Sequence, residues 1–131
     1  MSSFTVPDTG RIAWVDLTVP DAVAVRDFYR RVVGWGSADV DMGGYSDFNM
    51  LPAAGGAPVA GVCHARGVNA GLPAAWLVYV AVADLDASMA ACRDLGGDVV
   101  AGPSGMGSYG RYCVIRDPAG AHLALYEPAR A

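Results

Sequence analysis

The sequence is poor in charged residues, which make up 17% of its 131 residues, below the quarter that is usual in soluble domains. The formal net charge is −4, and beyond Arg30-Arg31 no cluster of basic residues occurs. Nucleic-acid binding needs a basic surface, so we expect no nucleic-acid partner.

Long apolar runs are also absent. None approaches the ~18 residues of a membrane-spanning helix, and Met1-Ser2-Ser3 does not open a signal peptide. We therefore expect no membrane contact and a cytoplasmic location. Apolar residues nevertheless make up 53% of the chain, which is rich for a monomer of this length and favours a cavity or a subunit contact.

Cysteine is scarce and unpaired. Cys63, Cys92 and Cys113 form no CxxC motif, and an odd number cannot all pair within one chain. We interpret them as small buried side chains in a reducing compartment. The sequence also lacks a serine nucleophile elbow, a paired-carboxylate motif and a dinucleotide-binding fingerprint.

An internal repeat is the most informative feature that is present. The segment 15–21 returns as 78–84, and the same offset of 63 positions carries Gly34 onto Gly97 and Gly61 onto Ala124. A single period of this length indicates two copies of one supersecondary unit rather than a solenoid. Each copy would be marginal alone, so both should share one domain.

Both halves show the same order of predicted elements. Arg11–Val19 alternates as a strand, Asp21 caps a helix, and Gly34 ends it. In the second half, Trp76–Ala83 is the strand and Asp84 or Asp86 is the cap. Shorter strands are predicted at 37–42, 45–51, 58–64, 98–101, 109–116 and 121–127. We predict a single domain, 1–131, with module one at about 10–64, a linker at about 65–73 and module two at about 74–128.

Three motifs carry a resemblance to a known family: Leu17-Thr18-Val19-Pro20-Asp21, then Phe28-Tyr29 with Val33-Gly34-Trp35, and finally the turn 116–121. From about Gly10 to Pro128 the chain resembles the vicinal oxygen chelate superfamily, which includes glyoxalase I, extradiol dioxygenases and bleomycin-resistance proteins. The resemblance implies an α+β fold, in which two tandem βαβββ modules pack side by side and form a cleft lined by curved mixed sheets.

The metal site of that family is not retained. The resemblance places its four metal ligands at Trp14, Gly61, Leu77 and Ala124. None of these side chains coordinates a divalent ion. We therefore expect no metal and no other cofactor.

Strand parity predicts which residues would line the cleft, because side chains two positions apart share a face. Together they offer aromatic walls and a few polar groups, which suit a flat, partly apolar ligand. The predicted ligand-binding residues are Trp14, Asp16, Val59, Cys63, Leu77, Tyr79, His122, Ala124 and Tyr126.

Asp16 and His122 have two interpretations. They are a catalytic base and its orienting partner, or each meets only backbone or water at the cleft mouth. The glycine-rich segment 102–108 is either a lid over the cleft or a long hairpin connection. Trp76 has the opposite parity to Leu77 and should pack against a helix.

Two function classes follow from the resemblance. The first is a metal-free binding protein, dimeric as in the family, that sequesters an aromatic or heterocyclic metabolite in antibiotic resistance or self-protection. The alternative is a metal-independent lyase, isomerase or cyclase of secondary metabolism that uses Asp16 and His122. A metal-dependent oxygenase or glyoxalase needs ligands that the sequence lacks.

Overall fold

Two compact units make up the chain in the computed structural model, which describes residues 7–129. The first unit is Trp14–Trp76, and the second comprises the other described residues. Along the chain, the order strand, helix, three strands occurs twice. This order confirms the α+β class and the repeated βαβββ topology. Within residues 7–129, no helix is long and apolar enough to cross a membrane.

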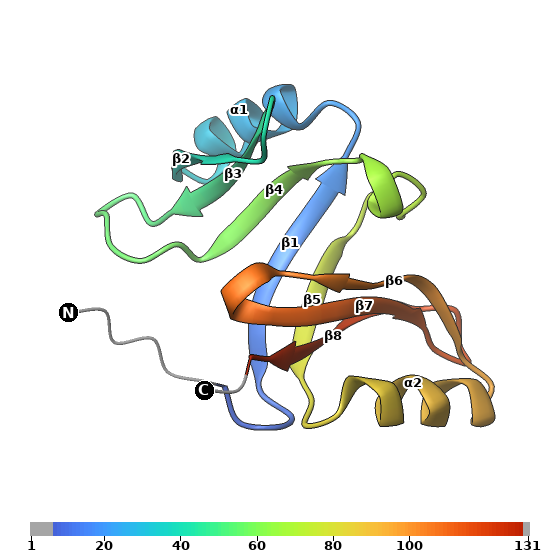
Figure 1. Cartoon of the computed structure of the whole chain (residues 1–131). Coiled ribbons are helices and arrows are strands. Elements are labelled where there is room, and N and C mark those ends of the chain that lie inside the picture. Colours follow the sequence, from blue (N-terminus) through green and yellow to red (C-terminus); the bar gives the residue numbers. More distant parts are fainter. Residues whose placement is uncertain (1–6, 130–131) are drawn as a thin grey trace. The chain divides into compact units, whose positions relative to one another are not determined.

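The sheet of the first unit has the order β2-β3-β4-β1. β1 is parallel to β4, whereas β3 runs antiparallel to β2 and β4. Helix α1 follows β1 directly (Figure 1). The bounds are β1 Ile12–Val19, α1 Ala22–Val32, β2 Gly36–Asp41, β3 Ser46–Leu51 and β4 Ala60–His64, followed by a short 3-10 helix, Gly67–Asn69.

The sheet of the second unit repeats this plan in the order β5-β8-β7-β6. β5 is parallel to β8, and β7 runs antiparallel to β8 and β6. Its bounds are β5 Trp76–Ala81, α2 Leu85–Asp94, β6 Asp98–Gly105, β7 Gly110–Arg116 and β8 His122–Pro128, with a 3-10 helix at Gly107–Tyr109.

Both helices begin directly after an aspartate that was predicted to cap them. The Asp21 carboxylate accepts the Ala24 backbone N–H at 3.3 Å, and the Asp84 carboxylate accepts that of Ala87 at 3.1 Å. Such bonds satisfy donors that a first helical turn leaves unpaired. Of the two candidate caps of α2, Asp84 is the cap. Gly34 ends α1 at a φ of 84°, a conformation that glycine adopts without strain.

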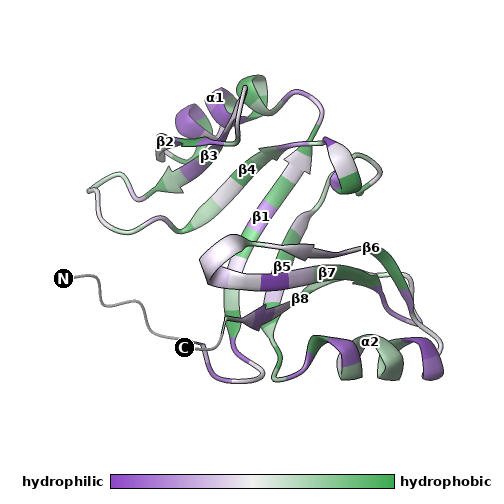
Figure 2. Ribbon diagram, in the orientation of Figure 1, coloured by the Kyte–Doolittle hydropathy of each residue, from purple (hydrophilic) through white to green (hydrophobic). Residues whose placement is uncertain are grey.

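Each helix covers one face of its own sheet. Against α1, β1 presents Leu17 and Val19, and the core continues with Phe48 and Met50 from β3. Trp76 joins this core and donates from its indole N–H to the Tyr29 hydroxyl at 3.1 Å, which confirms that it packs against a helix. The alternation of apolar and polar colour along β1 can be followed in Figure 2.

In the second unit the helix-side core is equally regular. Leu85 and Met89 of α2 pack on Cys113 of β7 and Leu125 of β8. Because successive strand residues point to opposite faces, the even-numbered residues of β7 and β8 face away from α2.

The glycine-rich segment 102–108 is partly strand. β6 was predicted to end at Ala101, but it continues to Gly105 and pairs Ser104 with Tyr112. The Met106 N–H then donates to the Gly110 carbonyl at 2.7 Å. Of the two interpretations, the hairpin connection describes this backbone.

Candidate functional site

The side chains of β1 and β4 that point away from α1 form what we call the first face: Trp14, Asp16, Thr18, Gly61 and Cys63. Asp16 lies opposite Gly61, and Thr18 lies opposite Cys63, in the parallel register. A Cβ atom added at Gly61 would lie 3.1 Å from the Asp16 Cβ and 3.4 Å from the Trp14 Nε1. The Trp14 indole and the Asp16 Cβ therefore both lie beside the bare backbone of Gly61.

Two further polar residues adjoin the first face. Phe48 and Met50 point into the helix-side core, so alternation directs Asp47 and Asn49 to the other side of β3. Asn49 lies opposite Gly61. Asp47 is only 9% exposed, and its Oδ1 accepts the His64 backbone N–H at 2.8 Å. We did not predict either residue, although the alternation of Phe48 and Met50 in the sequence was a usable signal.

Cys63 lies between two carboxylates of this face. Burial is the largest cause that raises the pKa of its thiol, followed by the charges of Asp16 and Asp47 and a hydrogen bond to Asp47. A raised pKa keeps a thiol protonated near neutral pH. Cys63 therefore contributes a neutral sulfur and a hydrogen-bond donor to the first face.

On the second unit, the side chains that point away from α2 include a group of apolar and aromatic residues. We call them the second face: Leu77, Tyr79, Tyr112, Ala124 and Tyr126. Tyr79 lies opposite Ala124, and its ring centroid is 5.8 Å from that of Tyr112. The Tyr126 hydroxyl donates to the Tyr109 carbonyl. Leu77, Tyr79, Ala124 and Tyr126 were predicted, whereas Tyr112, on β7, was not considered.

Two predicted residues lie at strand ends. Val59 precedes β4 and is 46% exposed, because the strand begins at Ala60 and not at Pro58. His122 is the first residue of β8, half-buried and opposite Arg116. Asp16 belongs to the first unit and His122 to the second.

The residues at the family's ligand positions do not fit a metal ion. Gly61 has no side chain, and the Trp14 Nε1 lies 3.4 Å from the position that its Cβ would take. Leu77 and Ala124 are buried hydrocarbon side chains that are 1% and 0% exposed. Divalent ions need oxygen, nitrogen or sulfur donors, and these four side chains supply none that coordinates.

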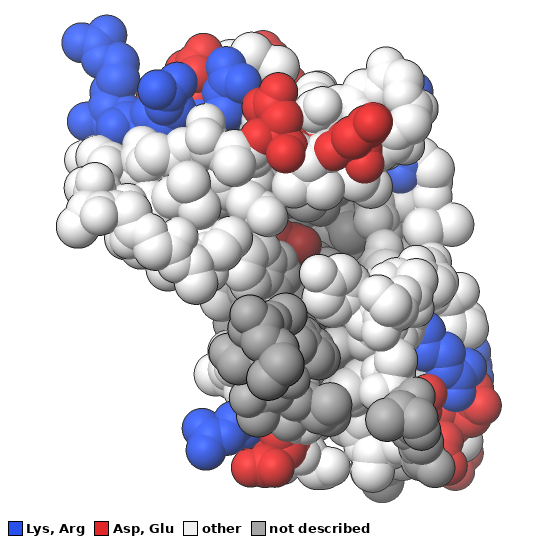
Figure 3. Space-filling model, turned by 60° about the vertical axis from the view of Figure 1, so that its left-hand side comes forward, with Lys and Arg blue, Asp and Glu red and all other residues white. Residues whose placement is uncertain are grey.

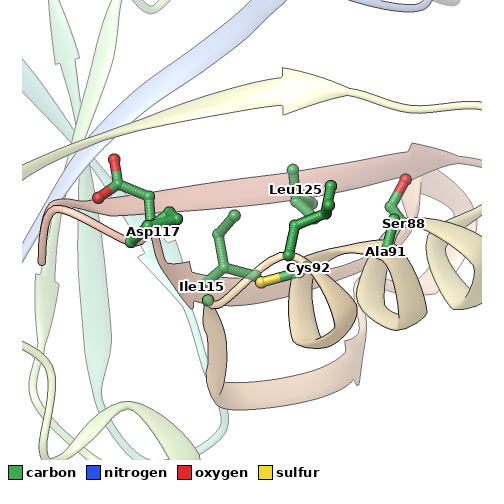
Figure 4. Close-up of a pocket in the computed structure, with 9 residues that line it drawn as sticks. Ser88, Ala91, Cys92, Ile115, Asp117 and Leu125 are labelled. Carbon is green, nitrogen blue, oxygen red and sulfur yellow. The ribbon is translucent and has the colours of Figure 1, made fainter.

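Two surface pockets lie elsewhere, and neither is lined by a predicted site residue. One, of about 580 Å³, is lined by Asp27, Arg30, Arg31 and Trp35; Figure 3 shows the basic side chains gathered over the region of α1. The other, of about 410 Å³, is mainly apolar and lies between α2 and the strands β7 and β8. Figure 4 shows Ser88, Ala91, Cys92, Ile115 and Leu125 around it.

Curated relatives match the chain over almost its whole length. It is 34% identical over 124 residues to "Putative glyoxylase CFP32" of Mycobacterium tuberculosis, which covers 95% of this chain and 46% of that protein. It is also 34% identical over 132 residues to "Anthracycline biosynthesis protein DnrV" of Streptomyces peucetius, which covers 89% of this chain and 46% of that protein. The chain thus spans about half the length of these relatives.

Solved structures share the fold at low sequence identity. A Streptomyces coelicolor methylmalonyl-CoA epimerase in complex with 2-nitronate-propionyl-CoA aligns at a TM-score of 0.59 and 21% identity, over 94% of this chain and 100% of that chain. The 2,2',3-trihydroxybiphenyl 1,2-dioxygenase of Sphingomonas wittichii aligns at 0.52 and 16%, over 94% and 46%.

A family model covers residues 11–125, from the start of β1 to the middle of β8. This match and the relatives agree with the three sequence motifs. The chain belongs to the Glyoxalase/Bleomycin resistance protein/Dioxygenase superfamily.

Proposed function

We propose that the protein is a metal-free small-molecule binding protein that sequesters an aromatic or heterocyclic metabolite, in antibiotic resistance or self-protection. The observation that carries this proposal is the content of the family's ligand positions. Where a metal-dependent relative needs donors, this chain has an indole, a bare glycine and two hydrocarbon side chains. Such groups offer contact surface to an organic ring rather than bonds to an ion.

The chemistry of the two faces supports a planar ligand with polar substituents. The first face carries the Trp14 indole and Asp16, and the second face carries the Tyr79 and Tyr112 rings. We propose that Trp14 and Tyr79 contribute stacking surface, and that Asp16 or His122 orients the ligand through hydrogen bonds. Val59, Cys63, Leu77, Ala124 and Tyr126 complete the proposed set of contacts.

The relatives support an aromatic ligand class. Two of them are named for anthracycline biosynthesis, and anthracyclines are planar polycyclic compounds. Because the chain spans only 46% of each of those proteins, their roles as whole proteins do not transfer directly. The shared half supports a place for this protein in secondary metabolism and a ligand with fused rings.

The metal-free part of the proposal is tested by elemental analysis. After dialysis against zinc, nickel, iron or manganese and then against buffer, the protein should retain far less than one metal ion per chain, because Trp14, Gly61, Leu77 and Ala124 supply no ligand. About one tightly held ion per chain would contradict the proposal and favour an oxygenase or a glyoxalase.

We further propose that the protein is a homodimer. Large apolar side chains of α1, including Phe28 at 56% and Val32 at 63%, are exposed, and the curated relatives are about twice as long as this chain. A stable dimer should bury at least about 1,000 Å² in total. Light scattering at micromolar concentration should give twice the mass of the chain, and a monomer mass would refute this proposal.

The second candidate is a metal-independent lyase, isomerase or cyclase. It is favoured by the burial of Asp16, which lies on the first face and is only 8% exposed. A carboxylate in such a place is suited to general base catalysis. Substitution of Asp16 separates this candidate from simple binding.

A further inference from the structure

The last turns of α1 carry more positive charge than the helix dipole explains. Arg26, Arg30 and Arg31 are three of the nine basic residues of the chain, and Figure 3 shows such side chains gathered over α1. Basic residues at a helix C-terminus offset the negative end of the macrodipole, which amounts to about half an elementary charge. Arg30 and Arg31 both lie in the last turn, so the dipole accounts for only part of their charge.

The nearby carboxylate of Asp27 does not neutralise this charge. Its Oδ1 is 3.0 Å from the Arg26 Nε and 3.9 Å from the Arg30 Nη1, so it pairs mainly with Arg26. Within the part of the chain that the structure describes, Arg31 has no carboxylate partner. The guanidinium groups of Arg30 and Arg31 are therefore available to an anion from solution.

Trp35 adds a fixed aromatic surface beside these arginines. Its ring centroid lies 5.9 Å from that of Tyr29 and 6.0 Å from that of Trp76. The Trp76 indole N–H donates to the Tyr29 hydroxyl at 3.1 Å, so the three rings hold each other in place. Trp35 is only half-buried, and it lines the pocket of about 580 Å³ together with the two arginines and Asp27.

This pocket is separate from the surfaces to which the article has given a role. Asp27, Arg30 and Arg31 are three and four residues apart and share one side of α1. Phe28 and Val32, the apolar side chains proposed for the dimer, each follow one residue later, about 100° further round the helix. The first face lies on the side of the sheet that points away from α1.

We propose that this pocket binds a small planar aromatic anion, with the ring against Trp35 and the carboxylate or phosphate group on Arg30 and Arg31. A guanidinium presents paired N–H donors that match the oxygens of either group, and an indole offers contact area to a ring. The volume of about 580 Å³ suits such a ligand, because small-molecule sites span about 300–1,000 Å³.

The test is calorimetric titration of the whole chain with 1-naphthoate and 1-naphthyl phosphate, which combine one ring system with either anion. 1-Naphthamide is the neutral comparison, and acetate and inorganic phosphate supply the anions without a ring. The variants are Arg30→Gln, Arg31→Gln, Trp35→Leu and Asp27→Asn. Arg93→Gln is the matched control, because Arg93 is the basic residue in the last turn of α2 and does not line this pocket.

At least one of the two aromatic anions should bind saturably, and more tightly than the neutral amide or the anions without a ring. Arg30→Gln and Arg31→Gln should each weaken this binding about fivefold, and Trp35→Leu by at least as much. Asp27→Asn should tighten it, because a competing carboxylate is removed, whereas Arg93→Gln should leave it unchanged. Added salt should weaken it, since the arginines are at the surface. The tighter of the two anions identifies the anionic group that the pocket prefers.

Three results would overturn the inference: no saturable binding of either aromatic anion, equal binding of 1-naphthamide, or affinities that both arginine variants leave unchanged. Weakening by Trp14→Ala in place of the arginine variants would assign the probes to the first face and would also overturn it. If Trp35→Leu does not fold, the arginine variants and Asp27→Asn decide the question, because a gain in affinity cannot arise from unfolding.

Discussion

Replacing Trp14 with alanine is expected to weaken binding of a planar aromatic ligand about tenfold or more. An aromatic pair contributes about 0.5–1.5 kcal/mol beyond the burial of its area, and loss of the indole also removes apolar contact area. A total of about 1.4 kcal/mol corresponds to a factor of ten in affinity. The measurement is calorimetric titration of wild type and Trp14→Ala with planar polycyclic probes, such as anthraquinone and acridine derivatives.

Leu95→Ala is a matched control for this prediction. Leu95 is 77% exposed and lies at the end of α2, so its loss removes an apolar side chain without touching either face. Gly61→Ala provides a second comparison, because its new methyl group would crowd the Trp14 indole and the Asp16 Cβ at 3.4 and 3.1 Å. It should weaken binding while leaving the indole in the protein. Equal affinities of Trp14→Ala and wild type would show that the ligand binds elsewhere.

Asp16→Asn is expected to distinguish binding from catalysis by about two orders of magnitude. A binding protein should keep its affinity within about fivefold, because the amide oxygen remains an acceptor in place of the carboxylate. An enzyme that uses Asp16 as a base should lose about 10²-fold or more in turnover. The two quantities are measured on the same variant, by titration and by product analysis after incubation with a candidate metabolite.

His122→Ala accompanies this variant. If both substitutions abolish a turnover that the wild type shows, the protein is a metal-independent enzyme and the sequestration proposal is wrong. If the wild type leaves the compound unchanged and Asp16→Asn still binds it, catalysis through Asp16 is excluded for that compound.

Much of the fold could be predicted because local signals agreed with each other. The alternation in β1, the aspartates that cap both helices and Gly34 at the end of α1 all carry a stereochemical requirement that is visible in the sequence. Parity then placed Trp14 and Asp16 on one face, and their closeness to Gly61 follows from the register of β1 and β4.

The remaining features depend on pairing that no short segment specifies. Gly102 and Pro103 are residues typical of a loop. β6 nevertheless continues past them, because it pairs with β7 as far as Gly105, which lies opposite Arg111. Val59 was predicted to lie within a strand, but β4 begins at the next residue, Ala60. The sequence did not point to Asp47 because its partner His64 is 17 positions away and comes close only through the β3–β4 register.

The central claim is that this chain binds a planar organic ligand without a metal. The most direct test is titration of chelator-treated protein, shown by elemental analysis to be metal-free, with the same polycyclic probes. We expect saturable binding of at least one probe in chelator-treated wild type, with unchanged affinity after zinc, nickel, iron or manganese is added. Binding of the probes that appears only when such a metal is restored would contradict it.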